Sequence, residues 1–276
     1  MKEYLQVLKY CFDKGVDVDS RSGKVRKAFG YQMRFNLEEG FPALTTKKLA
    51  WKSVTSELLW FLEGSNDERR LAEILYEQRR EEIKDKKTIW TQNAKSDYWI
   101  NKAKFDGDVG RIYGVQWRDF NGVDQIQNLI NGIKKEPDGR RHILSAWNPA
   151  EIDLMSLPAC HAFSQFFVSN GKLSCQLYQR SCDMFLGVPF NIASYSLLTH
   201  IIANECNLQV DEFIHTLGDF HIYHEHFHQV KNQLQRKPRK IPKLNFKPNS
   251  IFSYKISDFE LIDYDPYPAI KAKMNV

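Results

Sequence analysis

Apolar residues recur at intervals of three and four positions in several segments, which is the spacing that places side chains on one face of a helix. The pattern predicts helices at residues 1–15, 53–62, 123–135 and 192–206. The first segment, MKEYLQVLKYCFDKG, interleaves charges with apolar residues and lacks the uninterrupted apolar run of a signal peptide or membrane span. We therefore expect it to form a first helix of the folded protein.

Other segments combine β-branched and aromatic residues with alternation, which predicts strands at residues 142–147, 162–169 and 172–178. The last two are separated by Asn170-Gly171, a strong hairpin signal. The charge-dense run 77–87 predicts an exposed helix end or surface loop, and the run 236–247, rich in Lys and Pro, predicts a loop.

Strands and helices mix without strict alternation along the chain, and no linker, repeat or low-complexity tract divides it. This organisation predicts an α+β fold with helices packed on a mixed, largely antiparallel sheet. We expect a single domain that spans residues 1–276.

Composition narrows the class of protein. Hydrophobic residues make up 42% and charged residues 26% of 276 residues, which excludes a disordered or fibrous chain. The net charge of +5 suits an anionic small substrate and is also compatible with weak nucleic-acid binding. The five cysteines are odd in number and lack paired spacing, so we expect no disulfide framework, no structural zinc site and a reducing, cytoplasmic location.

A first candidate site is the stretch Leu157-Pro158-Ala159-Cys160-His161. A cysteine beside a proline-containing turn that leads into a strand is a candidate nucleophile, although a lone cysteine is more often an inert buried residue. On this segment alone both interpretations stay open.

A second candidate lies where a strand closes at residues 176–183. Arg180, Ser181 and Asp183 supply an anion ligand, a hydroxyl donor and an acceptor for a ring N–H, whereas the alternative is a surface salt bridge with a capping serine. Asn191 follows at the expected start of a helix, where its structural alternative is an N-cap.

A third candidate is the histidine-rich stretch 218–228. His224 and His228 would share one face of a helix, so metal binding has to be considered. The stretch lacks the HExxH order and no cysteine pair accompanies it, and we therefore expect no metal.

Taken together, these stretches resemble the thymidylate synthase family. The segment CQLYQRSCD followed by PFNIASY is highly specific to that family. The resemblance extends over nearly the whole chain, through FGYQMRFNLEEGFPALTTKK, SELLWFLEGSN, TIW, IYGVQWRDF, DGRRHILSAWNP, CHAF, GDFHIY and the tail YDPYPAIKAKMNV. It implies a thymidylate synthase-like fold and a homodimeric enzyme that transfers one carbon from 5,10-methylenetetrahydrofolate to C5 of dUMP without a metal.

The resemblance also implies roles for individual residues. Cys160 matches the nucleophile that attacks C6 of the uracil ring, and Arg180 matches an arginine that touches both the phosphate and that cysteine. Arg140 and Arg141 match a pair that reaches across the dimer interface into the partner's site. The residues that match the family's nucleotide ligands are Arg21, Arg140, Arg141, Arg180, Ser181, Asp183, Asn191, His221 and Tyr223.

Two further groups follow from the same resemblance. The catalytic group is Cys160, Glu57, Tyr113, His161, Arg180 and Asn191. In the family, the members of this group that take part in the proton transfer also hold ordered water. The folate group is Lys47, Trp90, Asp183, Gly187, Phe190 and Val276. Asn191 points to uracil, because the cytidylate-specific relative carries Asp at the matching position.

Several positions depart from the family pattern. The loop 21–26 is one residue short, Ala159 replaces a proline, Arg111 replaces another proline, and Phe220 stands where the family has a small residue. Such positions also vary in a hydroxymethylase branch, which adds water where the synthase transfers hydride. The sequence therefore predicts a synthase, with a dUMP hydroxymethylase giving 5-hydroxymethyl-dUMP and tetrahydrofolate as the alternative. A regulatory protein that binds RNA, suggested by the basic pI, is a further alternative without a recognised motif, so no nucleic-acid partner is expected beyond weak binding to mRNA.

Overall fold

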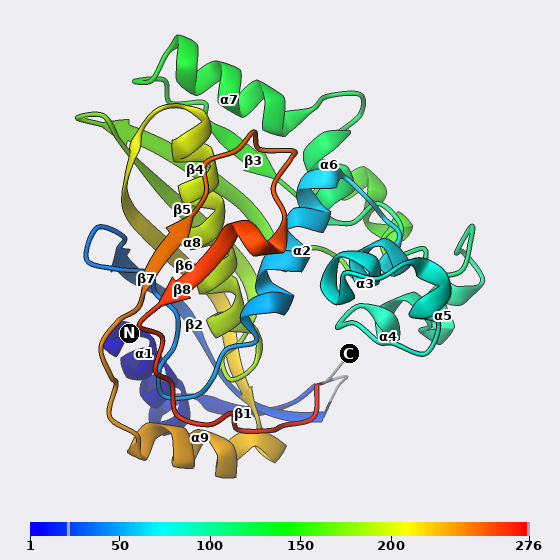
Figure 1. The fold of residues 1–276 in the computed structure, drawn as a ribbon. Coiled ribbons are helices and arrows are strands. Elements are labelled where there is room, and N and C mark those ends of the chain that lie inside the picture. The colour runs from blue at the N-terminus through cyan, green and yellow to red at the C-terminus, as the bar shows by residue number, and fades with distance from the viewer. Residues whose placement is uncertain (21–22, 275–276) are drawn as a thin grey trace.

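The computed structural model describes residues 1–20 and 23–274, and its ribbon is shown in Figure 1. The helices are α1 (Lys2–Lys14), α2 (Trp51–Glu63), α3 (Glu68–Tyr76), α4 (Thr91–Ala94), α5 (Asp97–Ile100), α6 (Tyr113–Arg118), α7 (Gln125–Lys135), α8 (Gly187–Glu205) and α9 (Phe227–Gln235). The strands are β1 (Val16–Ser20), β2 (Gly23–Asn36), β3 (Ile143–Ser145), β4 (His161–Ser169), β5 (Lys172–Asp183), β6 (Gln209–Tyr223), β7 (Lys243–Phe246) and β8 (Phe259–Ile262).

Six strands form one sheet in the order β1-β2-β6-β5-β4-β3, and β7 pairs with β8 in a separate two-stranded sheet. Within the large sheet β5 and β6 are parallel, because α8 provides the crossover between them, and the other neighbours are antiparallel. The α+β fold with a mixed, largely antiparallel sheet is confirmed.

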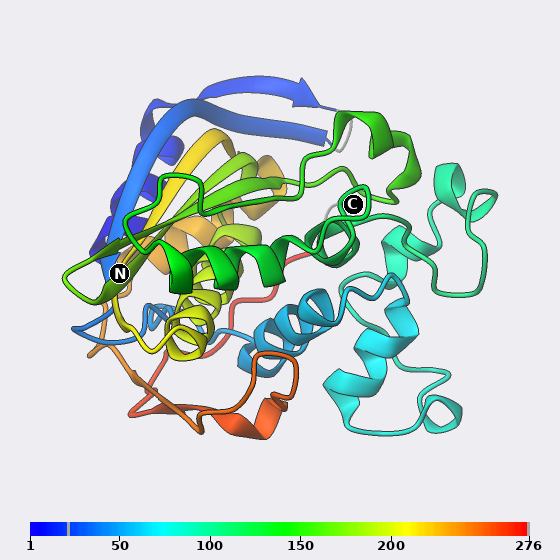
Figure 2. The same ribbon diagram turned by 90° about the horizontal axis from the view of Figure 1, so that it is seen from above.

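One face of the large sheet is covered by helices. Helix α8 is apolar on most of its circumference, which is typical of a helix buried on all sides, and it packs on β5, β6 and α2. Figure 2 shows α8 and α2 on the same side of the sheet, while the α3–α5 segment projects to one side. The C-terminal ends of β5 and β6 and the N-terminal end of α8 therefore lie close together.

The other face of the sheet carries exposed aromatic side chains. Burial alternates along β4 from Ala162 onward, so that Phe163 and Phe167 are 42% and 62% exposed while Phe166 between them is buried. Phe29 on β2 is 80% exposed. Exposed apolar residues gathered on one sheet face often mark an interaction surface.

The predicted helices are confirmed, with shifted ends. Helix α8 begins at Gly187 rather than at residue 192, and α7 begins at Gln125 after the Asp124 cap. The hairpin is also confirmed: Asn170 and Gly171 have φ of 50° and 73°, as a type I′ turn requires. Strand β3 is shorter than the predicted 142–147, and β5 continues past the predicted end at residue 178.

Two predictions were wrong or incomplete. The segment 236–247 is not entirely loop, because residues 243–246 form β7. Strands β1, β2, β6 and β8 were not predicted; burial along β6 does not alternate simply, since both of its faces are largely covered.

The histidine-rich stretch does not form one helix. Strand β6 runs to Tyr223, a 3₁₀ turn covers His224–His226, and α9 begins only at Phe227. Within residues 1–20 and 23–274 no group of three or more histidine, cysteine or acidic side chains is placed to hold a metal ion. In the same part of the chain no helix combines the length and apolarity needed to cross a bilayer.

Candidate active site

A cleft of about 1010 Å³ opens where β5, β6 and the first turn of α8 meet. Helix α2, the end of β1 and the C-terminal segment complete its walls. The residues predicted from sequence that line this cleft are Lys47, Glu57, Trp90, Tyr113, Cys160, His161, Arg180, Ser181, Asp183, Gly187, Phe190, Asn191, His221 and Tyr223.

Cys160 lies directly before β4 and lines the cleft. Its backbone N–H donates to the Tyr113 hydroxyl at 2.7 Å, and its Sγ lies 3.9 Å from Nη2 of Arg180. Burial raises the pKa of the Cys160 thiol, and the positive charge of Arg180 opposes that effect. Arg180 is thus the charged group that favours the thiolate.

Arg180 is held rigidly on β5. Its Nε donates to the Ala159 carbonyl and its Nη2 to the Pro158 carbonyl, both at 2.8 Å. Its guanidinium also lies 5.1 Å from the centre of the Trp147 ring. The arginine therefore fixes the turn that carries Cys160 and keeps its charge beside the sulfur.

Glu57 on α2 is a buried carboxyl that faces the cleft. Its Oε1 accepts a hydrogen bond of 2.6 Å from the indole N–H of Trp90. Burial raises the pKa of Glu57 to about 7, and the Trp90 hydrogen bond opposes the shift. A carboxyl that titrates near neutral pH can accept and return a proton.

His161 packs against Tyr113 with ring centres 4.9 Å apart and the rings tilted by 37°, and it meets Tyr195 edge-on. Burial lowers the pKa of His161 to about 4, which the Asn191 side chain opposes by hydrogen bonding, so the imidazole is neutral at pH 7. Its Nδ1 is buried and has no hydrogen-bond partner among the residues that the structure describes. Such an atom is suited to bind a water or a ligand group.

Asp183 shapes the entry into α8. Its Oδ1 accepts from the backbone N–H groups of Phe185 at 2.9 Å and Leu186 at 3.2 Å. This Asx turn places Gly187 and Phe190 on the cleft wall.

The sequence did not single out Asp219 and Lys27, which also line the cleft. Asp219 Oδ1 lies 3.2 Å from His221 Nδ1, which makes that nitrogen the donor, and Asp219 Oδ2 accepts from Lys27 at 2.7 Å. The hydrogen bond with His221 lowers the pKa of Asp219. Asp219 on β6 pairs with Ser181 on β5. If β6 had been predicted, this pairing would have placed Asp219 beside the candidate residues of β5.

Lys47 points inward. Its ammonium donates to the Phe185 carbonyl and lies 3.6 Å from the centre of the Phe185 ring. Burial lowers its pKa to about 8. The neighbouring Lys48 lines the cleft as an exposed residue.

A comparison with known protein families adds to this geometry. The family model described as thymidylate synthase matches residues 2–276. The chain belongs to the thymidylate synthase family. Members of this family bind dUMP and a folate and use methylenetetrahydrofolate as co-substrate, so the match supports a folate-dependent one-carbon transfer to dUMP.

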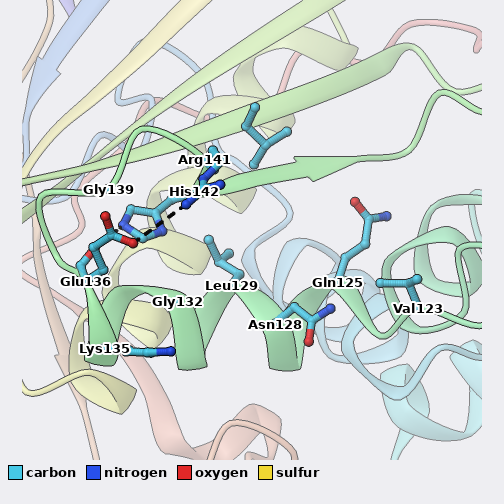
Figure 3. Close-up of a pocket in the computed structure, with 11 residues that line it drawn as sticks. Val123, Gln125, Asn128, Leu129, Gly132, Lys135, Glu136, Gly139, Arg141 and His142 are labelled. Carbon is cyan, nitrogen blue, oxygen red and sulfur yellow. Dashed lines mark hydrogen bonds and ion pairs between the residues drawn. The ribbon is translucent and has the colours of Figure 1, made fainter.

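The arginine pair matched to the thymidylate synthase family lies away from the chain's own cleft. Arg140 and Arg141 are exposed in the loop between α7 and β3. Figure 3 shows Arg141 near Glu136 and His142 at a second pocket of about 370 Å³, and Arg141 lies 3.8 Å from the Glu136 carboxylate. The predicted Arg21 and Val276 lie outside the described residues.

Three residues that depart from the thymidylate synthase pattern are absent from the described cleft wall. Phe220 is fully buried against Tyr10 and Tyr31, and Arg111 forms an ion pair of 2.6 Å with Glu151. Ala159 is buried and supplies the carbonyl that Arg180 uses. These departures therefore do not change the described lining of the site.

Proposed function

We propose that this chain is a thymidylate synthase that converts dUMP and 5,10-methylenetetrahydrofolate into dTMP and dihydrofolate, with residues 1–276 as one catalytic domain. The observation that carries the proposal is the approach of Arg180 to the Cys160 sulfur, 3.9 Å, in a cleft that also contains the buried Glu57–Trp90 pair. A positively charged neighbour is what an attacking thiol requires.

The nucleotide fits the polar end of the cleft. Arg180 and Ser181 are suited to bind the phosphate, since a planar guanidinium matches phosphate oxygens, and Arg21 is proposed to join them. His221 and Tyr223, farther along the same wall, are suited to the sugar hydroxyl.

Asn191 is the proposed reader of the base. It is 6% exposed and lines the cleft from the second turn of α8, which leaves no N-cap role for it. Its amide can donate to O4 and accept from N3–H of uracil. Cytosine presents the reverse order of donor and acceptor.

The proposed reaction begins with attack of the Cys160 thiolate on C6 of the uracil ring. The new S–C6 bond shifts the electron pair of the C5–C6 double bond toward C5 and O4, so C5 becomes the nucleophile that accepts the one-carbon unit. The hydrogen on C5 then leaves as a proton while the bond between the one-carbon unit and the folate nitrogen breaks. Hydride from the folate converts the resulting methylene into a methyl group, and the Cys160–C6 bond breaks as the C5–C6 double bond re-forms.

Glu57, Tyr113 and His161 line the cleft, and we assign them to this proton transfer. The pKa of Glu57, about 7, suits a carboxyl that relays protons through ordered water. The neutral His161 presents a buried nitrogen that no group in residues 1–20 and 23–274 bonds to, and such a nitrogen is suited to hold a water.

The remaining space fits a folate. A cleft of about 1010 Å³ lies at the upper end of the roughly 300–1,000 Å³ that ligand pockets span, which is consistent with a large ligand beside the nucleotide. Trp90 and Phe190 provide apolar walls, and the Asp183 carboxylate lies between the two proposed ligand positions. When bound, this co-substrate supplies the carbon and the hydride. Exposed Lys48 is better placed than inward-pointing Lys47 to meet its glutamate tail.

We further propose a cytoplasmic C2 homodimer. The sheet face that carries Phe163 and Phe167 is open, and a self-complementary apolar face is the usual basis of an isologous dimer. Arg140 and Arg141 lie exposed beyond the adjoining edge strand β3, where they are available to a partner's site.

Trapping with 5-fluoro-dUMP tests the proposed chemistry. The C5 fluorine cannot leave as a proton equivalent, so the reaction should stop with the nucleotide, the folate and the protein covalently joined. We expect mass spectrometry to place the adduct on the peptide that contains Cys160, and Cys160→Ser to prevent it. Absence of an adduct with the folded wild-type protein would refute the covalent mechanism.

A further inference from the structure

A buried ion pair lies outside the cleft, at the start of α3. Glu68 is 2% exposed, and its carboxylate accepts from Nε and Nη2 of Arg69, both at 2.6 Å. Replacing such a buried pair by apolar residues is often neutral or stabilising. A contribution to stability is therefore a weak explanation for this ion pair. Its other hydrogen bonds indicate a different role.

Glu68 gathers the segment that carries Trp90. Its Oε1 accepts from the hydroxyl groups of Thr88 and Thr91, each at 2.6 Å. Thr88 in turn accepts from the backbone N–H of Trp90 at 3.1 Å, and Thr91 accepts from the N–H of Thr88 at 2.8 Å. One carboxylate thus fixes both ends of the short turn that contains Trp90.

Arg69 ties the preceding loop to the same point. Its Nη1 donates to the carbonyls of Lys86 at 2.9 Å and Ile83 at 3.3 Å. At the other end of the chain of contacts, the Trp90 indole donates to Glu57 in the cleft. A continuous set of hydrogen bonds therefore runs from the Glu68–Arg69 pair to Glu57.

We propose that Glu68 is a positioning residue for the one-carbon transfer: it clamps Thr88 and Thr91 so that the Trp90 indole stays bonded to Glu57. The inference rests on the proposed function, because it assigns Glu57 to the proton relay. Hydrogen-bonded supports of this kind are what hold catalytic groups within a fraction of an ångström. Glu68 touches neither substrate nor the reacting atoms and acts only through Trp90.

The sharpest test uses Thr91, whose hydroxyl can be removed without changing the side-chain shape. Thr91→Val deletes the bond to Glu68, whereas Thr91→Ser keeps it. Glu73→Gln is the matched control, because Glu73 lies on the same helix and pairs with Arg70 and Arg80 without bonding to the Trp90 turn.

We expect Thr91→Val to lower kcat by about tenfold, with the dissociation constant of dUMP changed less than about twofold. The basic group in the pH profile of kcat should titrate at higher pH, because Glu57 loses the hydrogen bond that favours its charged form. The kcat and the pH profile of Thr91→Ser and of Glu73→Gln should remain near the wild-type values. If Thr91→Ser is as impaired as Thr91→Val, or if Thr91→Val keeps the wild-type profile, the positioning role is wrong.

An NMR measurement without turnover separates this inference from the proposed function. The indole N–H resonance of Trp90, assigned by its loss in Trp90→Phe, should move upfield in Thr91→Val and in Glu68→Gln but stay in place in Glu73→Gln. An unmoved resonance in folded Thr91→Val overturns the clamp. If the resonance moves while the wild-type protein has no activity with dUMP and folate, the clamp stands and the proposed function fails.

Discussion

Burial and charge act against each other on the groups that line the cleft. Burial raises the pKa of Cys160 and of Glu57, while Arg180 and the Trp90 indole oppose these shifts. The result is a thiol that depends on one arginine and a carboxyl that titrates near neutral pH. Such tuning is typical of sites in which protons move.

The pKa of Glu57 leads to a prediction about stability. It lies at about 7 in the folded chain against 4.5 for the ordinary carboxyl, so the folded state holds the proton more tightly. Wild-type stability should therefore fall relative to Glu57→Gln as pH rises from about 4.5 to 7, by about 3 kcal/mol at most. Urea unfolding of both proteins across this range measures the difference, and parallel curves would contradict the assignment.

Asn191 carries the prediction about the base. In Asn191→Asp a carboxyl that keeps its proton can donate to N3 of cytosine and accept from its amino group. The ratio of kcat/KM for dCMP over dUMP should rise by about tenfold or more. Asn191→Ala is the control and should lower kcat/KM for both nucleotides without inverting the preference between them. An unchanged ratio in Asn191→Asp would show that Asn191 does not select the base.

At the scale of elements, the β4–β5 hairpin aligns the Cys160 turn with Arg180. The register of the pair brings His161 opposite Gln179, and the backbone N–H of Arg180 donates to the Cys160 carbonyl at 2.9 Å. The turn that sets this register requires positive φ at Asn170 and Gly171.

Gly171→Ala tests that requirement. The φ of 73° disfavours a Cβ. A Cβ built there meets no atom of the described residues within 4 Å, so backbone strain is the cause of any loss. We expect the free energy of unfolding to fall by about 1 kcal/mol. Asn170→Gly should leave the free energy of unfolding nearly unchanged. Equal stability of Gly171→Ala and wild type would show that the turn does not need a left-handed residue.

Local patterns in the sequence were enough to predict α1, α2, α7, α8, the hairpin and the Cys160 turn, because each depends on neighbours within a few residues. The shorter helices α3, α4, α5, α6 and α9 were not predicted. The pairing of β2 with β6 was not predictable in this way. Burial in β2 alternates clearly only over residues 33–36, beyond the bend at Gly30 with φ of 75°. The bonds from Glu68 to Thr88 and Thr91 likewise span 20 and 23 residues, and no period links such positions.

At the scale of the whole molecule, the arginine pair lies outside the chain's own cleft, and the family resemblance assigns it to a partner's site. Arg141 is 90% exposed in its side chain, and the neighbouring sheet face presents Phe167 at 62% exposure. Both observations are accounted for if a second copy covers the sheet and receives the arginines.

Mixing two inactive variants tests the shared site. Arg140→Ala and Cys160→Ala would each be defective alone, but a mixed dimer contains one site with both defects and one with neither. After complete subunit exchange of equal amounts, activity should recover to about a quarter of wild type, since half of the dimers are mixed and each has one intact site. No recovery after exchange confirmed by mass spectrometry would refute the shared site.

The most direct test of the central proposal is the identity of the products. Wild-type protein is incubated with C5-tritiated dUMP and 5,10-methylenetetrahydrofolate, and tritium release, dihydrofolate absorbance and nucleotide mass are measured together. The synthase transfers hydride from the folate, so we expect one dihydrofolate for each tritium released, with dTMP as the nucleotide product. Release of tritium without dihydrofolate, with a nucleotide heavier than dTMP by one oxygen, would show a dUMP hydroxymethylase and contradict the account.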